Sequence, residues 1–313
     1  MNSRVSRRLF LAGIPAVAAT GAAGLYISQR PTSTGDTKKA PTIVPLYSSD
    51  RVLAAGVSQR IPFAVVDDAN ATGLQDSDAV SVKVVRDGTV IDQLQVAGRV
   101  VEHDHVGEDV DPDHQHAELF RYYPLQAELP EPGIYDLEID FGDVKSSMPV
   151  QVFDASEVGI VLPGTPMPAV VSATIDEPLD VDTLCTRFEG TCSFHEDSVA
   201  TLLQQAKPLA VLIATPALCS TAYCGPVLEL LIEAADRYPS INIAHLEPYA
   251  NSAAVSNNFA DPDIRLADSM AELGLEFEPS LFLVDESGIV TERIDNLFDA
   301  SELDAALTRL SQS

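Results

Sequence analysis

Short runs in which apolar and polar residues alternate fill the chain between residues 43 and 153. One such run places its apolar side chains at Ile61, Phe63 and Val65. Because successive side chains of a strand point to opposite faces, each run is typical of a strand with one buried face. Asp87-Gly88 stands where a hairpin turn is expected. Roughly seven such strands predict an all-β sandwich of immunoglobulin-like type over residues 42–154.

From about residue 195 onward, helical and extended patterns alternate instead. Apolar residues at Val199 and Leu202 predict a helix, and the apolar run "PLAVLIAT" that follows predicts a buried strand. The last helix is indicated by a capping box of Asp299 and Glu302. The expected order is α, β, α, β, α, β, β, α, which is typical of an α/β domain over residues 185–313.

The first thirty residues differ from the rest of the chain, because they contain four arginines and no acidic residue. The stretch "SRRLFLAG", with Arg7 and Arg8 before an apolar run, resembles a twin-arginine export signal. An ordinary membrane anchor is the alternative, since residues 9–27 at helical rise would just span a bilayer. Both alternatives place the body of the protein outside the cytoplasm, and cleavage of the signal stays open.

Two segments lack a hydrophobic period and are interpreted as linkers. Residues 31–41 are polar, and residues 155–184 are rich in proline. The chain is therefore expected to comprise a signal or anchor (1–30), a linker (31–41), the β-sandwich (42–154), an extended linker (155–184) and the α/β domain (185–313).

The protein is strongly acidic, with a formal net charge of −28 at pH 7. A surface of this sign repels phosphates and gains no affinity from counterion release. Nucleic acid is therefore excluded as an expected partner.

Two of the four cysteines, Cys219 and Cys224, lie in "ATPALCSTAYCGPVLELL" between an apolar run and a helical one. Pro226 suits a first helical turn, so Cys224 is expected near a helix N-terminus, where amides and the helix dipole stabilise a thiolate. If residues 219–224 were helical, their α-carbons would lie about 8–9 Å apart. A disulfide needs less than about 7 Å, so its formation requires a loop here. The pattern predicts a redox-active pair, with a static structural disulfide as the alternative.

The segment "YCGPV" at residues 223–227 resembles the active-site turn of the thioredoxin family, and "EPSLFLVDESG" resembles that family's later segment with a cis-proline. The resemblance covers residues 185–313 and implies a thioredoxin-like α/β domain. It also implies that Gly225 and Pro226 shape the turn and that Pro279 aligns the substrate backbone. Val227 stands where the family has its second cysteine, which leaves Cys219 as the partner of Cys224. This cysteine spacing further resembles that of peroxiredoxins of the bacterioferritin-comigratory type.

Three functions follow from these resemblances. The leading prediction is an exported thiol–disulfide oxidoreductase that acts on protein thiols or disulfides and requires no cofactor. The second is a thiol peroxidase in which peroxide oxidises Cys219 and Cys224 resolves the sulfenic acid, which would require an activating cation nearby. The third is a protein that binds or handles copper or zinc, similar to thioredoxin-like copper chaperones. The direction of electron flow stays open.

The other two cysteines, Cys185 and Cys192, close an eight-residue loop ahead of the first expected helix of the α/β domain. They are predicted to form a structural disulfide that fixes the start of this domain. His195 is interpreted as a polar residue near a helix N-terminus. His245 lies in a predicted strand and is interpreted as a core histidine with its hydrogen bonds satisfied.

Four of the six histidines form two His-x-His pairs, His103 with His105 and His114 with His116. On a strand, alternate residues face the same side, so each pair could present two imidazoles together. Copper and zinc both accept such nitrogen ligands. The four residues are candidate metal ligands, and a flexible acidic loop with incidental histidines is the alternative.

Overall fold

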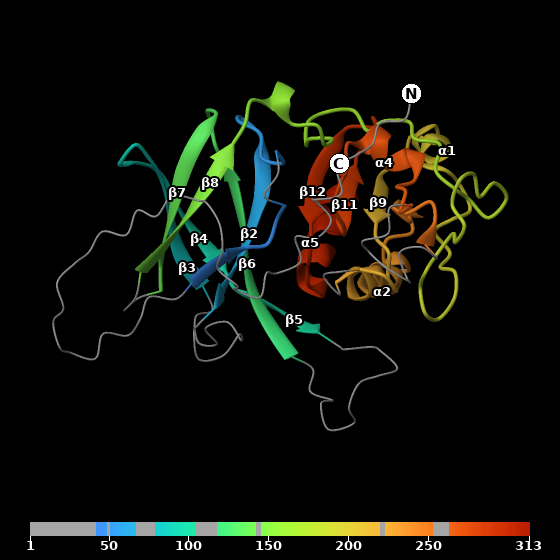
Figure 1. The fold of residues 1–313 in the computed structure, drawn as a ribbon, viewed down its shortest axis with the longest axis horizontal. Helices are drawn as coiled ribbons and strands as arrows, with labels where there is room; N and C mark the ends of the chain where they lie inside the picture. Colours follow the sequence, from blue (N-terminus) through green and yellow to red (C-terminus); the bar gives the residue numbers. More distant parts are fainter. Residues whose placement is uncertain are drawn as a thin grey trace.

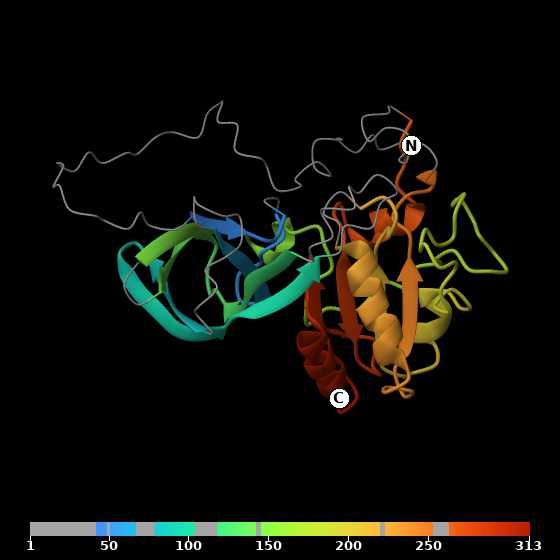
Figure 2. The ribbon, with the colours of Figure 1, turned by 90° about the horizontal axis from the view of Figure 1, so that it is seen from below.

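The computed structural model contains three four-stranded sheets and four α-helices in its described part. The described residues are 42–48, 51–66, 79–103, 118–141, 145–219, 223–252 and 263–313. Two of the sheets are formed by residues before 153, and they lie beside the third sheet and its helices (Figures 1 and 2).

Every strand pair in the two N-terminal sheets is antiparallel. The first sheet has the order β1 (Thr42–Pro45), β2 (Ser58–Val66), β6 (Glu118–Glu128) and β5 (Arg99–His103). The second has the order β4 (Thr89–Ala97), β3 (Ala79–Arg86), β7 (Gly133–Asp140) and β8 (Lys145–Val152). In β7 every second side chain is buried, and the Phe63 and Tyr123 rings stack at 5.3 Å within the same core. The alternating pattern thus forms an all-β part, in which strands such as β7 bury one face, whereas β2 also buries Arg60 and Ala64 on its other face.

The third sheet has the strand order β10-β9-β11-β12. Its strands are β9 (Leu209–Ile213), β10 (Asn242–Leu246), β11 (Ser280–Val284) and β12 (Val290–Asp295), and its helices are α1 (Val199–Leu203), α2 (Cys224–Ala235), α4 (Asp268–Leu273) and α5 (Ala300–Leu310). Strand β10 runs parallel to β9, whereas β11 is antiparallel to both β9 and β12. Helices α2 and α5 share a core with one face of β9, and α1 and α4 share a core with the other. Both faces of β9 are therefore covered, and all five of its residues are buried.

The predicted fold class, a thioredoxin-like α/β domain beside an immunoglobulin-like sandwich, is wrong for the described residues. These residues are mostly β, and no thioredoxin α/β fold is evident among them, although an all-β N-terminal part is compatible with the prediction. The physical reason is that two of the four described helices are short, since α1 has five residues and α4 has six. Between residues 154 and 198 the backbone is irregular apart from the short 3₁₀ helix η2 (Ala155–Glu157).

The expected signal or anchor (1–30), including its apolar stretch 9–27, and the expected linker 31–41 lie outside the described residues. Within the described ranges, no helix is both long enough and apolar enough to cross a membrane.

A buried ion pair joins the N-terminal sheets to the third sheet. The Arg60 guanidinium on β2 contacts the Glu302 carboxylate on α5, with 2.7 Å between Nε and Oε1. It also donates to the carbonyl oxygens of Asp295 and Leu297, at 2.8 and 2.7 Å. Tyr122 on β6 donates to the second oxygen of Glu302 at 2.6 Å. These contacts satisfy the charged groups at the junction and fix α5 against the N-terminal sheets.

Gly274 ends helix α4 in the left-handed conformation, with φ of 63°. A Cβ atom at this position would collide with the carbonyl oxygen of Gly159. We expect Gly274→Ala to lower the free energy of unfolding by about 3 kcal/mol, because the left-handed strain of about 1–2 kcal/mol adds to this clash. The measurement is urea denaturation. Gly56→Ala is the control, since its φ of 70° gives the same strain with no atom within 4 Å of the new Cβ. Equal losses of stability in the two variants would show that the clash at residue 274 contributes nothing.

Candidate functional site

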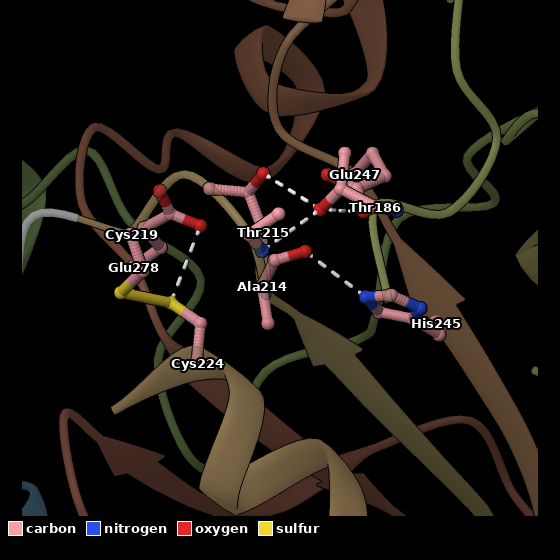
Figure 3. The surroundings of a disulfide bond; sticks show 9 residues. Thr186, Ala214, Thr215, Cys219, Cys224, His245, Glu247 and Glu278 are labelled. Atoms are coloured by element: carbon pink, nitrogen blue, oxygen red, sulfur yellow. Dashed lines mark hydrogen bonds between the residues drawn. A yellow bond between two sulfur atoms is a disulfide. The ribbon is translucent and has the colours of Figure 1, made fainter. Parts of the chain in front are cut away.

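The structure joins Cys219 and Cys224 in a disulfide, with 5.9 Å between their α-carbons. Cys224 is the first residue of α2, whereas Cys219 lies in the chain that leads away from the end of β9. The pair therefore spans the start of a helix, as Figure 3 shows, and the α-carbon distance suits a disulfide. The two sulfurs differ in access, because Cys224 is fully buried and Cys219 is partly exposed.

Cys224 stands at the start of α2, beside backbone amides that the helix leaves unpaired. The first amides of α2 have no partner within the helix, and their dipoles point toward the cysteine. Pro226 lies in this first turn, where its missing N–H costs no hydrogen bond. At Gly225 a Cβ atom would meet only the carbonyl oxygen of Pro216, 3.8 Å away. The described geometry therefore gives no steric reason for glycine at this position.

Glu278 is a site residue that the sequence analysis missed. Its Oε2 atom lies 3.5 Å from Cys224 Sγ, and its side chain is buried. Burial raises the pKa of Glu278 well above its usual range, and the nearby carboxylate of Glu247 adds to the effect. The backbone N–H of Thr215 and the hydroxyl of Tyr249 donate to the carboxyl group. Glu278 is thus held beside Cys224 in an environment that favours a protonated carboxyl.

Pro279 follows Glu278 through a cis peptide bond and directly precedes β11. Its ring is buried, and its carbonyl oxygen accepts a hydrogen bond of 2.8 Å from the backbone of Asn296. The predicted contact of Pro279 with a substrate backbone stays a prediction.

A second buried carboxyl, Glu247, lies on the chain just after β10. Its Oε1 atom accepts hydrogen bonds from the backbone N–H and the hydroxyl of Thr186, at 2.6 and 2.9 Å. The Thr186 hydroxyl lies 3.2 Å from that of Thr215, as Figure 3 shows. Burial raises the pKa of Glu247 to about 7. Polar contacts thus continue from the surroundings of the disulfide toward strand β10.

Cys185 and Cys192 do not form the predicted disulfide in this structure; both are free, buried thiols. Their sulfurs lie 3.7 and 3.5 Å from Nδ1 of His245, respectively. Hydrogen bonding to Cys192 lowers the pKa of the Cys185 thiol, and both neighbouring imidazoles add to this effect. The physical reason for the difference is that imidazoles stand beside the two thiols and provide polar partners.

The two imidazoles belong to His195 and His245, with 3.1 Å between His195 Nε2 and His245 Nδ1. His195 precedes α1, as expected, but its side chain is buried and joins the cysteines. His245 lies in β10, as expected. It is not only a core histidine with satisfied hydrogen bonds, because its Nδ1 atom also faces both cysteine sulfurs and His195. One donor atom from each of these four side chains lies within 4.8 Å of the others, so the group could hold a metal ion.

A second group, Cys219, Cys224 and Glu278, also has ligand atoms within 4.8 Å of one another. Its two sulfurs are bonded to each other here, so they are not free to bind a metal in this state.

The predicted histidine cluster cannot be placed in the same way. His103 ends strand β5, whereas His105, His114 and His116 lie outside the described residues. Copper or zinc binding by these four residues stays a prediction.

No protein-family model and no curated protein matches the chain.

Proposed function

We propose that the protein is a thiol–disulfide oxidoreductase whose redox centre is the Cys219–Cys224 pair. The observation that carries this proposal is a disulfide between a partly exposed sulfur and a fully buried sulfur at a helix start. Such a pair has one sulfur that a substrate can reach and one that the protein can stabilise after the bond opens.

In the proposed exchange, a substrate thiolate attacks the accessible sulfur of Cys219. A new bond forms between the substrate sulfur and Cys219, and the bond between Cys219 and Cys224 breaks. The electron pair of the broken bond stays on Cys224, which leaves as a thiolate. A second substrate thiolate then attacks the substrate sulfur of the mixed disulfide; the bond to Cys219 breaks, Cys219 leaves as a thiolate, and the substrate becomes a disulfide while both cysteines are reduced. The same steps in reverse reduce a substrate disulfide.

Two features near Cys224 support its role as the leaving group. The amides at the start of α2 stabilise the thiolate electrostatically. The carboxyl of Glu278, 3.5 Å away, is in a position to donate a proton to this sulfur and to take it back in the reverse reaction. Glu278 is therefore assigned the general acid and base role.

The partner class and location are part of the same proposal. The arginine-rich N-terminal segment resembles an export signal, and export would place the centre in a compartment where disulfides persist. Protein thiols and disulfides are the substrate class, and Pro279, next to Glu278, is assigned to align the substrate backbone. The peroxidase alternative would require a cation beside Cys219 and stays a prediction.

The proposal predicts that the two cysteines are not equivalent. With Cys224→Ser, the accessible thiol of Cys219 should attack a disulfide substrate and remain trapped as a mixed disulfide. With Cys219→Ser, the thiol of Cys224 is buried, so trapping should be at least several-fold slower. Mass spectrometry of each variant with a disulfide-containing peptide measures the trapped fraction. Insulin reduction by either variant should fall to the rate without protein.

The two variants control for each other, because each removes the same disulfide and so loses the same cross-link. Unequal trapping with similar thermal unfolding temperatures would therefore reflect access rather than damage to the fold. Equal or faster trapping at Cys224 would contradict the assigned roles. A wild-type protein that neither reduces insulin nor oxidises a dithiol peptide would refute the proposed function.

A further inference from the structure

Four buried side chains outside the redox centre bring two sulfur and two nitrogen atoms together. They are Cys185, Cys192, His195 and His245, and all of their ligand atoms lie within 4.8 Å of one another. Cys185, Cys192 and His195 come from the irregular chain before α1, whereas His245 comes from β10. The group therefore joins a segment with few backbone hydrogen bonds of its own to the edge strand of the third sheet.

The distances among these atoms fit the edges of a metal-centred tetrahedron. Zinc binds sulfur at about 2.3 Å and nitrogen at about 2.0–2.1 Å, which puts a tetrahedral sulfur and nitrogen about 3.6 Å apart and two nitrogens about 3.3 Å apart. From Nδ1 of His245, the two sulfurs lie at 3.7 and 3.5 Å, and Nε2 of His195 lies at 3.1 Å. Each of these contacts is thus within about 0.2 Å of the value for one shared zinc ion.

The orientation of the His245 imidazole supports the same interpretation. His245 Nε2 donates to the carbonyl oxygen of Ala214 at 2.9 Å, so in the neutral imidazole Nδ1 carries the lone pair, and this atom faces the two sulfurs. Such a hydrogen bond to the outer nitrogen is the usual support of a metal-ligating histidine. His195 Nδ1 is buried and has no hydrogen-bond partner within the described residues. His195 is therefore oriented chiefly by what lies at its Nε2 atom.

We propose that these four residues form a structural zinc site. Two cysteines and two histidines in a tetrahedron are a ligand set that selects Zn²⁺, and four protein ligands leave no open position for a substrate. Both cysteines would bind as thiolates, so Zn²⁺ and two thiolates form a neutral centre. A neutral centre suits this position, because all four side chains are buried.

A route for the ion lies beside the site. A pocket of about 420 Å³ is lined by both histidines and by the carboxylates of Asp180, Asp268 and Glu272, among other residues. Acidic side chains raise the local concentration of a divalent cation at the entrance. The pocket thus provides the entry path that a buried metal site needs.

Zinc at this position would stabilise the chain around the redox centre without taking part in its chemistry. His245 contacts Ala214, which directly follows β9 and begins the segment that leads to Cys219. The site is separate from the disulfide, so zinc binding and thiol exchange can be tested independently.

The test is the metal content of the full-length protein, purified without chelator and measured by elemental analysis. We expect one zinc ion per chain, and a cobalt-substituted sample should show the intense visible absorption of tetrahedral Co²⁺ with thiolate ligands. The variants Cys192→Ser and His245→Ala should each lose most of the bound zinc. The matched control is the double variant Cys219→Ser/Cys224→Ser, which removes two cysteines from the other group and should retain the full zinc content.

A measurement on the wild-type protein covers the case in which the ligand variants fail to fold. Titration of the native protein with a mercurial reagent in the presence of a chromogenic zinc indicator should release one zinc as Cys185 and Cys192 react. The proposal would be overturned if the purified protein contained copper instead of zinc, or no stoichiometric metal. Retention of zinc by folded Cys192→Ser, its loss from the Cys219/Cys224 double variant, or a Cys185–Cys192 disulfide in the native protein would overturn it as well.

Discussion

Glu302→Ala is expected to lower the free energy of unfolding by about 3–5 kcal/mol, because it leaves the Arg60 guanidinium buried without its counter-ion. The Arg60 side chain is only 3% exposed, and both oxygens of Glu302 are engaged, by Arg60 and by the Tyr122 hydroxyl. Carbonyl oxygens of Asp295 and Leu297 accept from Arg60 but carry no full charge. Urea denaturation followed by circular dichroism measures the loss.

An exposed ion pair on the same helix provides the control. Arg309 contacts Glu292 at 2.8 Å, but the Arg309 side chain is 59% exposed, so Arg309→Ala should cost less than about 1 kcal/mol. The double variant Arg60→Met/Glu302→Leu should recover part of the loss, since it removes both charges from the interior. A loss for Glu302→Ala as small as that for Arg309→Ala would contradict a structural role for the buried pair.

The strands were the most predictable part of the fold, because alternation is a local property of the sequence. Ile61, Phe63 and Val65 alternate with other residues along β2, and Phe63 packs on Tyr123 of the neighbouring strand. A strand that covers one core must show this period, so the pattern can be read without knowledge of its partners.

The helices were harder to predict, and the fold class was wrong for this reason. Val199 and Leu202 do occupy one face of a helix, but α1 ends at Leu203 after a single buried turn. A few apolar residues at helical spacing give the period but not the length, which depends on what the helix packs against. Segments predicted as helical therefore contributed less helix than expected, and the sheets dominate the structure.

The redox pair could be found from the sequence because its two cysteines are separated by only four residues and precede a helix signal, Pro226. Glu278 was not singled out, although it begins the segment "EPSLFLVDESG" whose resemblance pointed to Pro279. It lies 54 positions from Cys224 in the sequence, and the pairing of β11 with β9 brings the two residues close. The cysteine and histidine group was missed for a similar reason. The spacing Cys185-x6-Cys192-x2-His195 was a usable local signal, but the fourth member, His245, arrives through the parallel pairing of β10 with β9.

Glu278→Gln is expected to lower the rate of thiol–disulfide exchange at neutral pH by about 100-fold, because an amide does not transfer a proton to or from Cys224 at this pH. The amide has nearly the same shape and can still accept from Thr215 and Tyr249, so the disulfide should form normally. Stopped-flow reduction by a dithiol peptide measures the rate. Glu276→Gln is the matched control: it makes the same side-chain substitution two residues away, outside the network described around Cys224.

The same substitution should change how stability depends on pH, which separates a protonated Glu278 from one that is merely close to Cys224. The pKa of Glu278 is raised in the folded protein by burial, with Glu247 adding to the effect, while Thr215 and Tyr249 oppose it. The folded state therefore holds this proton more tightly than the unfolded state, whose value is near 4.5. The stability associated with Glu278 is then fully present below that value and is lost as pH rises toward and through the folded pKa. Glutamine carries no such proton, so the variant should match the wild type near pH 4 and be more stable above it, in urea denaturation measured at several pH values. A variant that is less stable than the wild type at pH 8, or that exchanges thiols at the wild-type rate, would show that Glu278 is ionised in the folded protein or takes no part in the reaction.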